Sequence, residues 1–235
     1  MNRRFCIIFG LCYLLSCSFN GFCQGKVTRP TNQQSRTSNH KTSRNVTISE
    51  PDGYVNGHGY VDLGLPSGTK WATCNVGASS PDKSGEYFSW GEIETKTEYS
   101  DNACTTVYKE ISDFSGNPYY DVASAKWGDN WCIPTVDETD ELAKLCKWTW
   151  IKYNLSTGYK ITGPNGKSIF LPAKGWKDEA KIKFSGPHGI IWTSSPSDVT
   201  YGSYALNFYK GQDDNIENRH YLYRRIGANV RPIIR

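Results

Sequence analysis

The chain lacks any hydrophobic run long enough to cross a bilayer as a helix. Its longest uncharged apolar stretch, residues 5–19, is shorter than the roughly 20 residues that a transmembrane helix requires. The mean hydropathy of −0.58 also argues against an integral membrane protein. There is one methionine among 235 residues, against 11 prolines and 22 glycines, which excludes a helical bundle or a coiled coil.

Closely spaced cysteine and histidine motifs are missing as well. No two cysteines have C-x-x-C spacing and the four histidines are scattered, which argues against a zinc site and against a thiol nucleophile beside a histidine. The number of cysteines beyond residue 49 is even. In an exported chain this favours two structural disulfides, for which three connectivities exist. The four cysteines are Cys74, Cys104, Cys132 and Cys146.

The N-terminus has the pattern of an export signal. Two arginines precede the apolar stretch, and small residues stand before Gln24 where signal peptidase requires them, so residues 1–23 are predicted to be a signal peptide. Alternatively, residues 14–17 resemble a lipobox, which would leave Cys17 as a lipidated N-terminus. Both alternatives place the protein outside the cytoplasm, in the extracellular space or on the outer-membrane surface.

Residues 24–49 are polar and basic, and are predicted to form a flexible linker because they contain too few apolar side chains to fold. Residues 50–235 are rich in aromatic residues and are predicted to form one domain. Seven of the 27 basic residues, and none of the 23 acidic ones, precede residue 50. The net charge of +4 therefore belongs to the leader and the linker, while the domain itself is slightly acidic, which argues against nucleic acid as a partner.

Two helices are predicted. Thr135 and Glu138 have the spacing of a capping box, and apolar residues recur at helical spacing up to Cys146. Acidic residues in the first turns of this strong helix complement its dipole, so a metal site is not needed to explain them. A weaker helix is predicted over residues 122–127.

The rest of the domain has the pattern of antiparallel strands and long loops. The clearest hairpin joins residues 159–162 to residues 168–171, and Asn165 with Gly166 would supply the positive φ angles of its turn. These elements predict an α+β fold. Further strands are predicted at residues 60–64, 70–76, 148–153, 190–194, 204–209 and 229–233.

Ordered sequence blocks along the domain resemble the Fibrobacter succinogenes major paralogous domain family. The blocks are LGLPSGTKWATCNVGA at 63–78, YFSWGE at 87–92, IPT at 133–135, GPNG at 163–166, IFLPA at 169–173, WTSS at 192–195 and GANVRP at 227–232. The family is similar to the C-type-lectin-like fold, so the resemblance implies that fold. It implies an exported protein and carries no general biochemical activity.

The resemblance also bears on the disulfides. The family usually has arginine and methionine where this chain has Cys132 and Ile133. Cys104 and Cys132 therefore look like an added pair, which implies the bridges Cys104–Cys132 and Cys74–Cys146.

No catalytic set is evident. Enzymes of the same fold require a late cysteine pair or a histidine triad, and this chain has neither. A Ser-His-Asp hydrolase is the alternative, since Ser194, Ser195, Ser197, Asp198 and His188 are close in sequence. No nucleophile-elbow glycines surround those serines. We therefore expect no enzymatic activity and no cofactor.

A ligand-binding surface is expected near the C-terminal strands, because the fold commonly builds its recognition surface there. Tyrosine, tryptophan, asparagine and arginine combine contact area with adaptable hydrogen bonds. The candidates are Trp176, Tyr201, Tyr204, Asn207, Tyr209, Asp213, Asn215, Arg219 and Tyr221. Asp213, Asp214, Asn215 and Glu217 form a weak calcium candidate, although a polar hairpin tip explains them equally well.

The sequence thus predicts an exported, non-catalytic binding module for a glycan or a protein. The alternative is a structural or assembly subunit of an envelope or fimbrial complex.

Overall fold

The computed structural model describes residues 47–213 and 216–235. The predicted signal peptide, the Cys17 lipidation site and most of the linker lie outside the described residues. The domain begins slightly before the predicted residue 50. The Ser49 amide donates to the Ser168 carbonyl (3.2 Å), the Ser168 amide returns a bond to Ser49 Oγ (2.9 Å), and Lys160 Nζ reaches the Thr47 carbonyl (2.8 Å).

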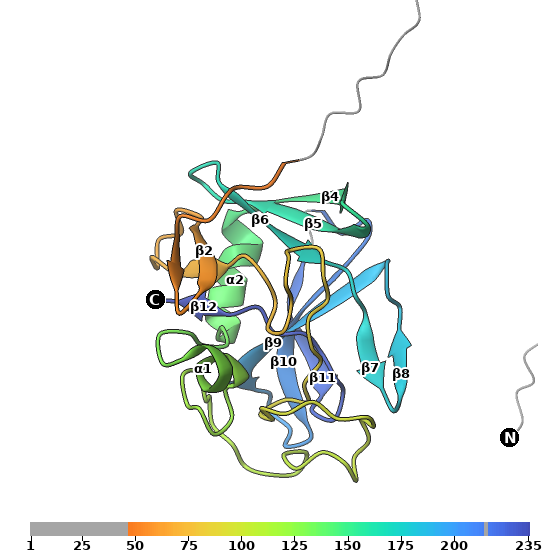
Figure 1. The fold of residues 1–235 in the computed structure, drawn as a ribbon. Coiled ribbons are helices and arrows are strands. Elements are labelled where there is room, and N and C mark those ends of the chain that lie inside the picture. The colour runs from red at the N-terminus through yellow and green to blue at the C-terminus, as the bar shows by residue number, and fades with distance from the viewer. Residues whose placement is uncertain (1–46, 214–215) are drawn as a thin grey trace, which may run out of the picture. The chain divides into compact units, whose positions relative to one another are not determined.

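The described chain is an α+β domain with two helices and twelve strands, in which the strands of each sheet pair antiparallel (Figure 1). The elements are β1 (Gly53–Val55), β2 (His58–Asp62), β3 (Lys70–Ala72), α1 (Val122–Trp127), α2 (Val136–Leu145), β4 (Lys147–Tyr153), β5 (Ser156–Thr162), β6 (Ser168–Pro172), β7 (Trp176–Asp178), β8 (Lys181–Lys183), β9 (His188–Pro196), β10 (Gly202–Tyr209), β11 (Glu217–Tyr223) and β12 (Ile233–Ile234).

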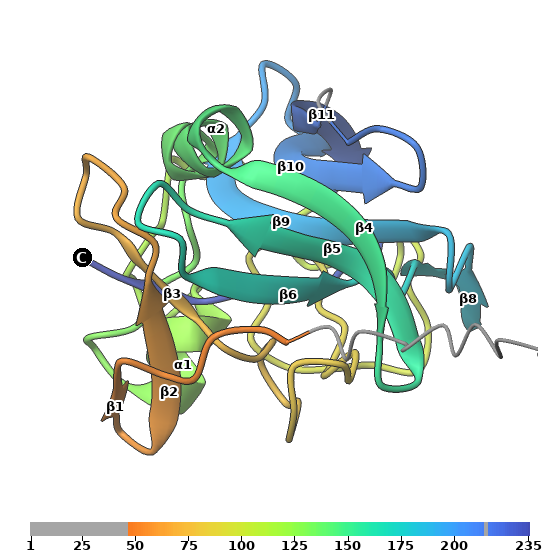
Figure 2. The same ribbon diagram turned by 90° about the horizontal axis from the view of Figure 1, so that it is seen from above.

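The strands form four small sheets. Their orders are β1-β2-β3-β12, β11-β10-β9, β4-β5-β6 and β7-β8. We call the β11-β10-β9 sheet the central sheet. Helix α2 packs against all three of its strands and lies beside it in Figure 2. The β7–β8 ribbon stands on the opposite side of the central sheet from β1–β3 (Figure 1).

The central sheet is buried on both faces because apolar residues follow one another along its strands. On β9, Ile190 and Trp192 belong to one core cluster and Ile191 to the other. On β10, Ala205 and Leu206 divide in the same way. A strand with two buried faces has no polar alternation. It is therefore held rigidly, and the loops at its two ends have a fixed base.

Both predicted helices are confirmed, with their caps. The Thr135 hydroxyl accepts the Glu138 amide at 3.3 Å, and the Glu138 carboxylate accepts the Thr135 amide at 2.8 Å, which completes the capping box of α2. Asp121 caps α1 by accepting the amides of Ala123 and Ser124. No helix among the described residues is long and apolar enough to span a membrane.

The β5–β6 hairpin is confirmed, but its turn differs from the prediction. Gly166 has a φ of 84°, whereas Asn165 is not among the residues with positive φ. The Gly166 amide donates to Gly163 and the Gly163 amide donates to Lys167. The loop is thus longer than a two-residue turn, and only its glycine needs the left-handed conformation.

The predicted strand at residues 229–233 is mostly irregular. Only Ile233 and Ile234 form β12, while Asn229 makes one isolated bridge to Ile191. Pro232 lacks an amide and so cannot extend the ladder. Conversely, β1, β7, β8 and β11 were not predicted: β1, β7 and β8 are only three residues long, and β11 begins with a run of polar residues.

The predicted disulfides Cys74–Cys146 and Cys104–Cys132 are wrong, because all four thiols are free. The three buried cysteines lie beside different groups. Cys104 Sγ lies 3.5 Å from Thr106 Oγ1, and Cys132 Sγ donates to the Ile233 carbonyl at 3.8 Å. Cys146 is buried where α2 ends.

We expect four free thiols per domain, with unequal reactivity. Cys74 is half-buried and should react first with iodoacetamide, whereas Cys104, Cys132 and Cys146 are buried. Burial raises the pKa of Cys132 to about 11 and that of Cys146 to about 12, so little thiolate forms there at neutral pH. Peptide mass spectrometry after timed alkylation measures the order in which the four thiols react. Recovery of disulfide-linked peptides from protein purified without reductant would contradict the expectation of four free thiols.

Candidate ligand-binding surface

The predicted binding residues do not form one site. Strand β10 is eight residues long, so its two ends are roughly 25 Å apart. Tyr209 is at one end with Trp176 nearby, whereas Tyr201 adjoins the other end with Tyr221. The candidates therefore divide into two groups at opposite ends of the central sheet.

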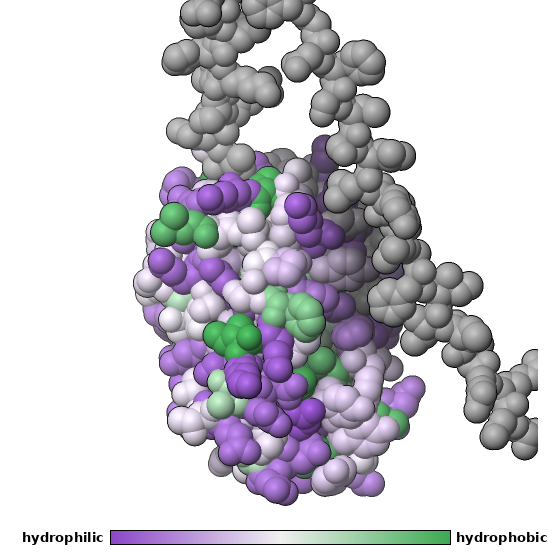
Figure 3. All heavy atoms as spheres, turned by 90° about the vertical axis from the view of Figure 1, so that its right-hand side faces the viewer, coloured by the Kyte–Doolittle hydropathy of each residue, from purple (hydrophilic) through white to green (hydrophobic). Residues whose placement is uncertain are grey.

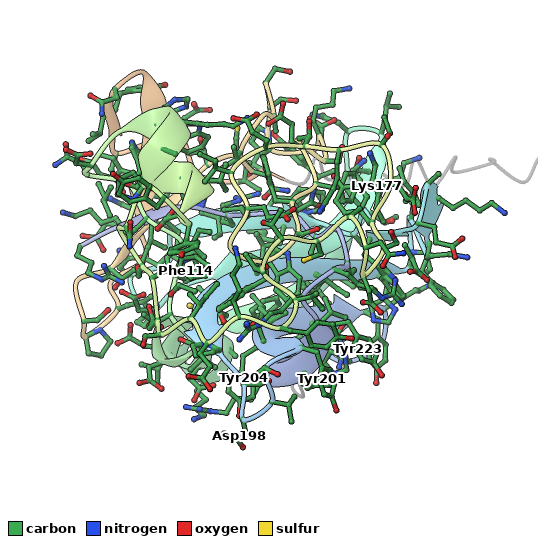
Figure 4. All side chains as sticks on the ribbon, turned by 90° about the horizontal axis from the view of Figure 1, so that it is seen from below. Phe114, Lys177, Asp198, Tyr201, Tyr204 and Tyr223 are labelled. Atoms are coloured by element: carbon green, nitrogen blue, oxygen red, sulfur yellow. The ribbon has the colours of Figure 1, made fainter. Side chains whose placement is uncertain are left out.

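The Tyr201 end carries three clustered tyrosines. The rings of Tyr201 and Tyr223 stack with centroids 5.8 Å apart and an interplanar angle of 24°, and Tyr221 meets both edge-on. Tyr201 and Tyr223 are 40% and 47% exposed. Tyr204 pairs with Tyr221 across the β10–β11 ladder, and Figure 4 shows it at the same end of the sheet. The cluster thus offers aromatic faces to solvent.

A hollow of about 440 Å³ opens beside these tyrosines, and we call it the Arg224 hollow. One wall is the loop 109–112 and the other is the loop 196–200 that precedes Tyr201. The labelled Asp198 lies near Tyr204 and Tyr201 in Figure 4. The lining combines Lys109, Glu110, Ile111, Ser112, Pro196, Ser197, Asp198, Val199, Thr200 and Arg224.

A second hollow of about 380 Å³ shares Lys109 with the first, and we call it the Tyr119 hollow. It is formed within the long loop between residues 91 and 120. Tyr119 lines it and is 83% exposed, while Tyr108 is another exposed tyrosine of the same loop. We refer to the two hollows with Tyr119, Tyr201 and Tyr223 as the tyrosine surface.

Sequence reasoning missed most of the tyrosine surface. Tyr108, Lys109 and Tyr119 were not predicted because they lie in the long loop before α1, outside the C-terminal strands, and Tyr223 ends β11, a strand that was not predicted. The available signal was the density of tyrosines in residues 108–120, a segment with no strand or helix pattern. Exposed tyrosines in a long loop are typical of recognition surfaces.

The other group of candidates lies where β7, β9 and β10 meet. Trp176 stacks on Phe184 with centroids 4.9 Å apart and meets His188 edge-on, and His188 contacts Tyr209. Asn207 is buried, with its side-chain oxygen 2.9 Å from His188 Nε2. These side chains contact one another, and Phe184 and Tyr209 are the exposed rings of the group, at 60% and 39%.

Arg219 is held by acids rather than left for a ligand. Its guanidinium donates to Asp140 at 2.8 Å and to Asp137 at 2.8 Å, which ties β11 to α2. The hydrogen bond with Asp140 raises the pKa of Arg219.

Asp213, another predicted binding residue, contacts the core through its backbone. Its amide donates to Tyr159 Oη at 2.9 Å, and burial raises the pKa of the Tyr159 phenol to about 12.

The calcium candidate is only partly within the described residues. Asp214 and Asn215 lie outside them, and nothing is described of the Glu217 side chain. Among residues 47–213 and 216–235, no three acidic, cysteine or histidine side chains are grouped as metal ligands.

Two serines of the hydrolase alternative bond an acid, and the third, Ser197, bonds the Val199 backbone. Ser194 Oγ donates to Asp113 at 2.8 Å, and Ser195 Oγ donates to the same carboxylate at 2.5 Å. His188 starts the same strand, six residues before Ser194, which is roughly 20 Å away along β9. The structure therefore does not bring these residues together as a Ser-His-Asp set.

Comparison of the chain with family models, with curated proteins and with solved structures gave no match. The resemblance to the major paralogous domain family therefore stays a prediction. The residues of the tyrosine surface carry the functional argument.

Proposed function

We propose that the chain is an exported, non-catalytic binding module of C-type-lectin-like fold that recognises a glycan or a protein at the tyrosine surface. The observation that carries the proposal is the pair of adjoining hollows flanked by exposed tyrosines. Tyrosine gives a large, rigid contact area with a polar tip. Export to the extracellular space or the outer-membrane surface rests on the leader at residues 1–23, and mass spectrometry of the mature N-terminus tests it.

The geometry favours a glycan as the ligand. The stacked pair Tyr201 and Tyr223 presents aromatic faces, on which sugar rings pack, while the hollows offer hydroxyl and charged groups for sugar hydroxyls. The 109–112 wall is tied to the buried Arg224 by the bond from Nη1 to the Lys109 carbonyl (2.6 Å), which reduces the ordering of the protein that opposes binding.

Replacing Tyr201 and Tyr223 together by alanine is expected to weaken ligand binding at least about tenfold, since buried aromatic contacts dominate interfaces. The assay is a glycan array, together with affinity capture from cell-surface extracts, followed by calorimetry on the hits. Tyr54→Ala is the matched control, because Tyr54 is an exposed tyrosine on β1. Arg219→Ala should also leave binding unchanged. Equal affinity of the double variant and the wild type would exclude the tyrosine surface.

A second candidate function, a subunit of an envelope assembly, is favoured by the β7–β8 ribbon. Ile182 and Phe184 are 51% and 60% exposed there. Figure 3 shows hydrophobic side chains among hydrophilic ones on the face that this ribbon presents. Co-purification of a stoichiometric partner that is lost in the double variant Ile182→Ser and Phe184→Ser would support this function. A wild type that stays monomeric and alone would count against it.

A further inference from the structure

Arg224 is a buried cation at the base of the Arg224 hollow. Arg224 is 2% exposed, and its guanidinium carbon lies 4.1 Å from the centroid of the Trp90 ring. Nε donates to the Gly202 carbonyl and to Ser203 Oγ, both at 3.0 Å. Nη1 donates to the carbonyls of Thr106 (3.2 Å) and Lys109 (2.6 Å). The side chain thus joins the long loop to β10.

Two features of Arg224 are left unexplained by this structural role. All its acceptors are neutral, and no described carboxylate forms an ion pair with it. Nη2 makes no hydrogen bond to any described residue. A buried charge is costly unless an anion or a full set of hydrogen bonds compensates it. Burial accordingly lowers the pKa of Arg224 from its usual value.

The remaining charges of the hollow are at its rim. Lys109, Glu110 and Asp198 all line it, and all three are exposed to solvent. Their charges are screened by water, whereas a charge at the base acts in a medium of lower dielectric. The hollow therefore attracts an anion at its base, although its formal charges balance.

We propose that the Arg224 hollow binds the carboxylate of an acidic sugar, which accepts from Arg224 Nη2. This inference rests on the proposed function and names the class of ligand for the same surface. Lys109 and the hydroxyls of Ser112, Ser197 and Thr200 line the same hollow and supply further donors. A glycan is favoured over an acidic peptide because Tyr201 adjoins the hollow through the backbone bond from the Arg224 amide to the Tyr201 carbonyl (3.0 Å).

The test uses an array that holds carboxylated, sulfated and neutral glycans and glutamate-rich peptides, probed with the full mature chain. Hits are compared by calorimetry with their methyl esters, for example trigalacturonate against its fully esterified form. We expect carboxylated glycans among the hits and at least about tenfold weaker binding of the ester, as loss of a charge-assisted hydrogen bond predicts.

Rim variants keep the test independent of folding. Asp198→Asn removes an exposed acid that faces the hollow, and should tighten carboxylated glycans about two- to fivefold without affecting neutral ones. Asp129→Asn, an exposed acid that follows α1, is the matched control. Arg224→Lys should weaken the acidic glycans specifically, provided that its melting temperature is unchanged.

The outcomes separate the two proposals. Neutral glycans that bind as tightly as acidic ones, or esters that bind as tightly as acids, would overturn the carboxylate assignment and leave the binding module intact. Binding of the acidic peptides alone would overturn the glycan as the source. If no glycan and no surface protein bound, the proposed function itself would fail, and the carboxylate site with it.

Discussion

Replacing Asp121 by alanine is expected to lower the free energy of unfolding by about 3–5 kcal/mol. Asp121 is fully buried, and its two carboxylate oxygens accept four backbone amides. Oδ1 accepts from Ala123 (2.8 Å) and Ser124 (3.1 Å), while Oδ2 accepts from Gly116 (2.7 Å) and Ile133 (2.8 Å). One side chain thus caps α1 and holds two loop segments.

Alanine would leave these four amides buried or competing for water, and each unsatisfied donor costs about 1–3 kcal/mol. Asp121→Asn is the informative partner. It keeps an oxygen for the two helix amides but places an amino group against the amides of Gly116 and Ile133, so its cost should be intermediate. Urea denaturation of both variants measures the ranking. A loss below about 1 kcal/mol for the alanine variant would refute this role of Asp121.

Removing the buried guanidinium of Arg231 is expected to have an effect of similar size, about 3–5 kcal/mol for Arg231→Met. Arg231 has no exposed surface. Its Nε donates to Asn75 Oδ1 (2.8 Å), and Nη1 and Nη2 donate to the carbonyls of Ala72 and Phe170 (both 3.0 Å). The irregular C-terminal segment is thereby fastened to β3 and β6, which a methionine cannot do.

Arg235→Met is the matched control for Arg231→Met. Arg235 pairs with Glu138 at 2.7 Å, but its side chain is about half exposed, so the pair is worth about 1 kcal/mol or less. Thermal unfolding should therefore separate the two variants. For a domain of this size, each kcal/mol lowers the melting temperature by about 2–4 °C. Equal melting temperatures for the two variants would contradict the bridging role of Arg231.

The helices and the β5–β6 hairpin could be predicted because their signals are local. Thr135 and Glu138 are three residues apart, and the turn between β5 and β6 is marked by Gly166. Strands β7 and β8 could not be predicted, since their lysines and short length resemble a loop. Their pairing depends on contacts such as the bridge from Lys177 to Gly227, which no local pattern records.

The structure brings the predicted binding residues together only in part. Tyr201 and Tyr221 lie at one end of the central sheet, whereas β10 carries Tyr209 to the far end. Arg219 was predicted to bind ligand, and its pairing with acids on α2 had no local signal, since those acids are about 80 residues away in sequence. The disulfide prediction was wrong for a related reason. An even number of cysteines says nothing of the distances between their sulfur atoms in the fold.

Amide hydrogen exchange of the domain, with and without the tightest glycan from the array, tests the tyrosine surface most directly. We expect slower exchange in residues 109–112 and 197–200, which line the Arg224 hollow, and in residues 222–225 at the adjoining strand end. The segment 176–184 should exchange at its free rate. Protection confined to 176–184, or spread evenly over the domain, would contradict binding at the tyrosine surface.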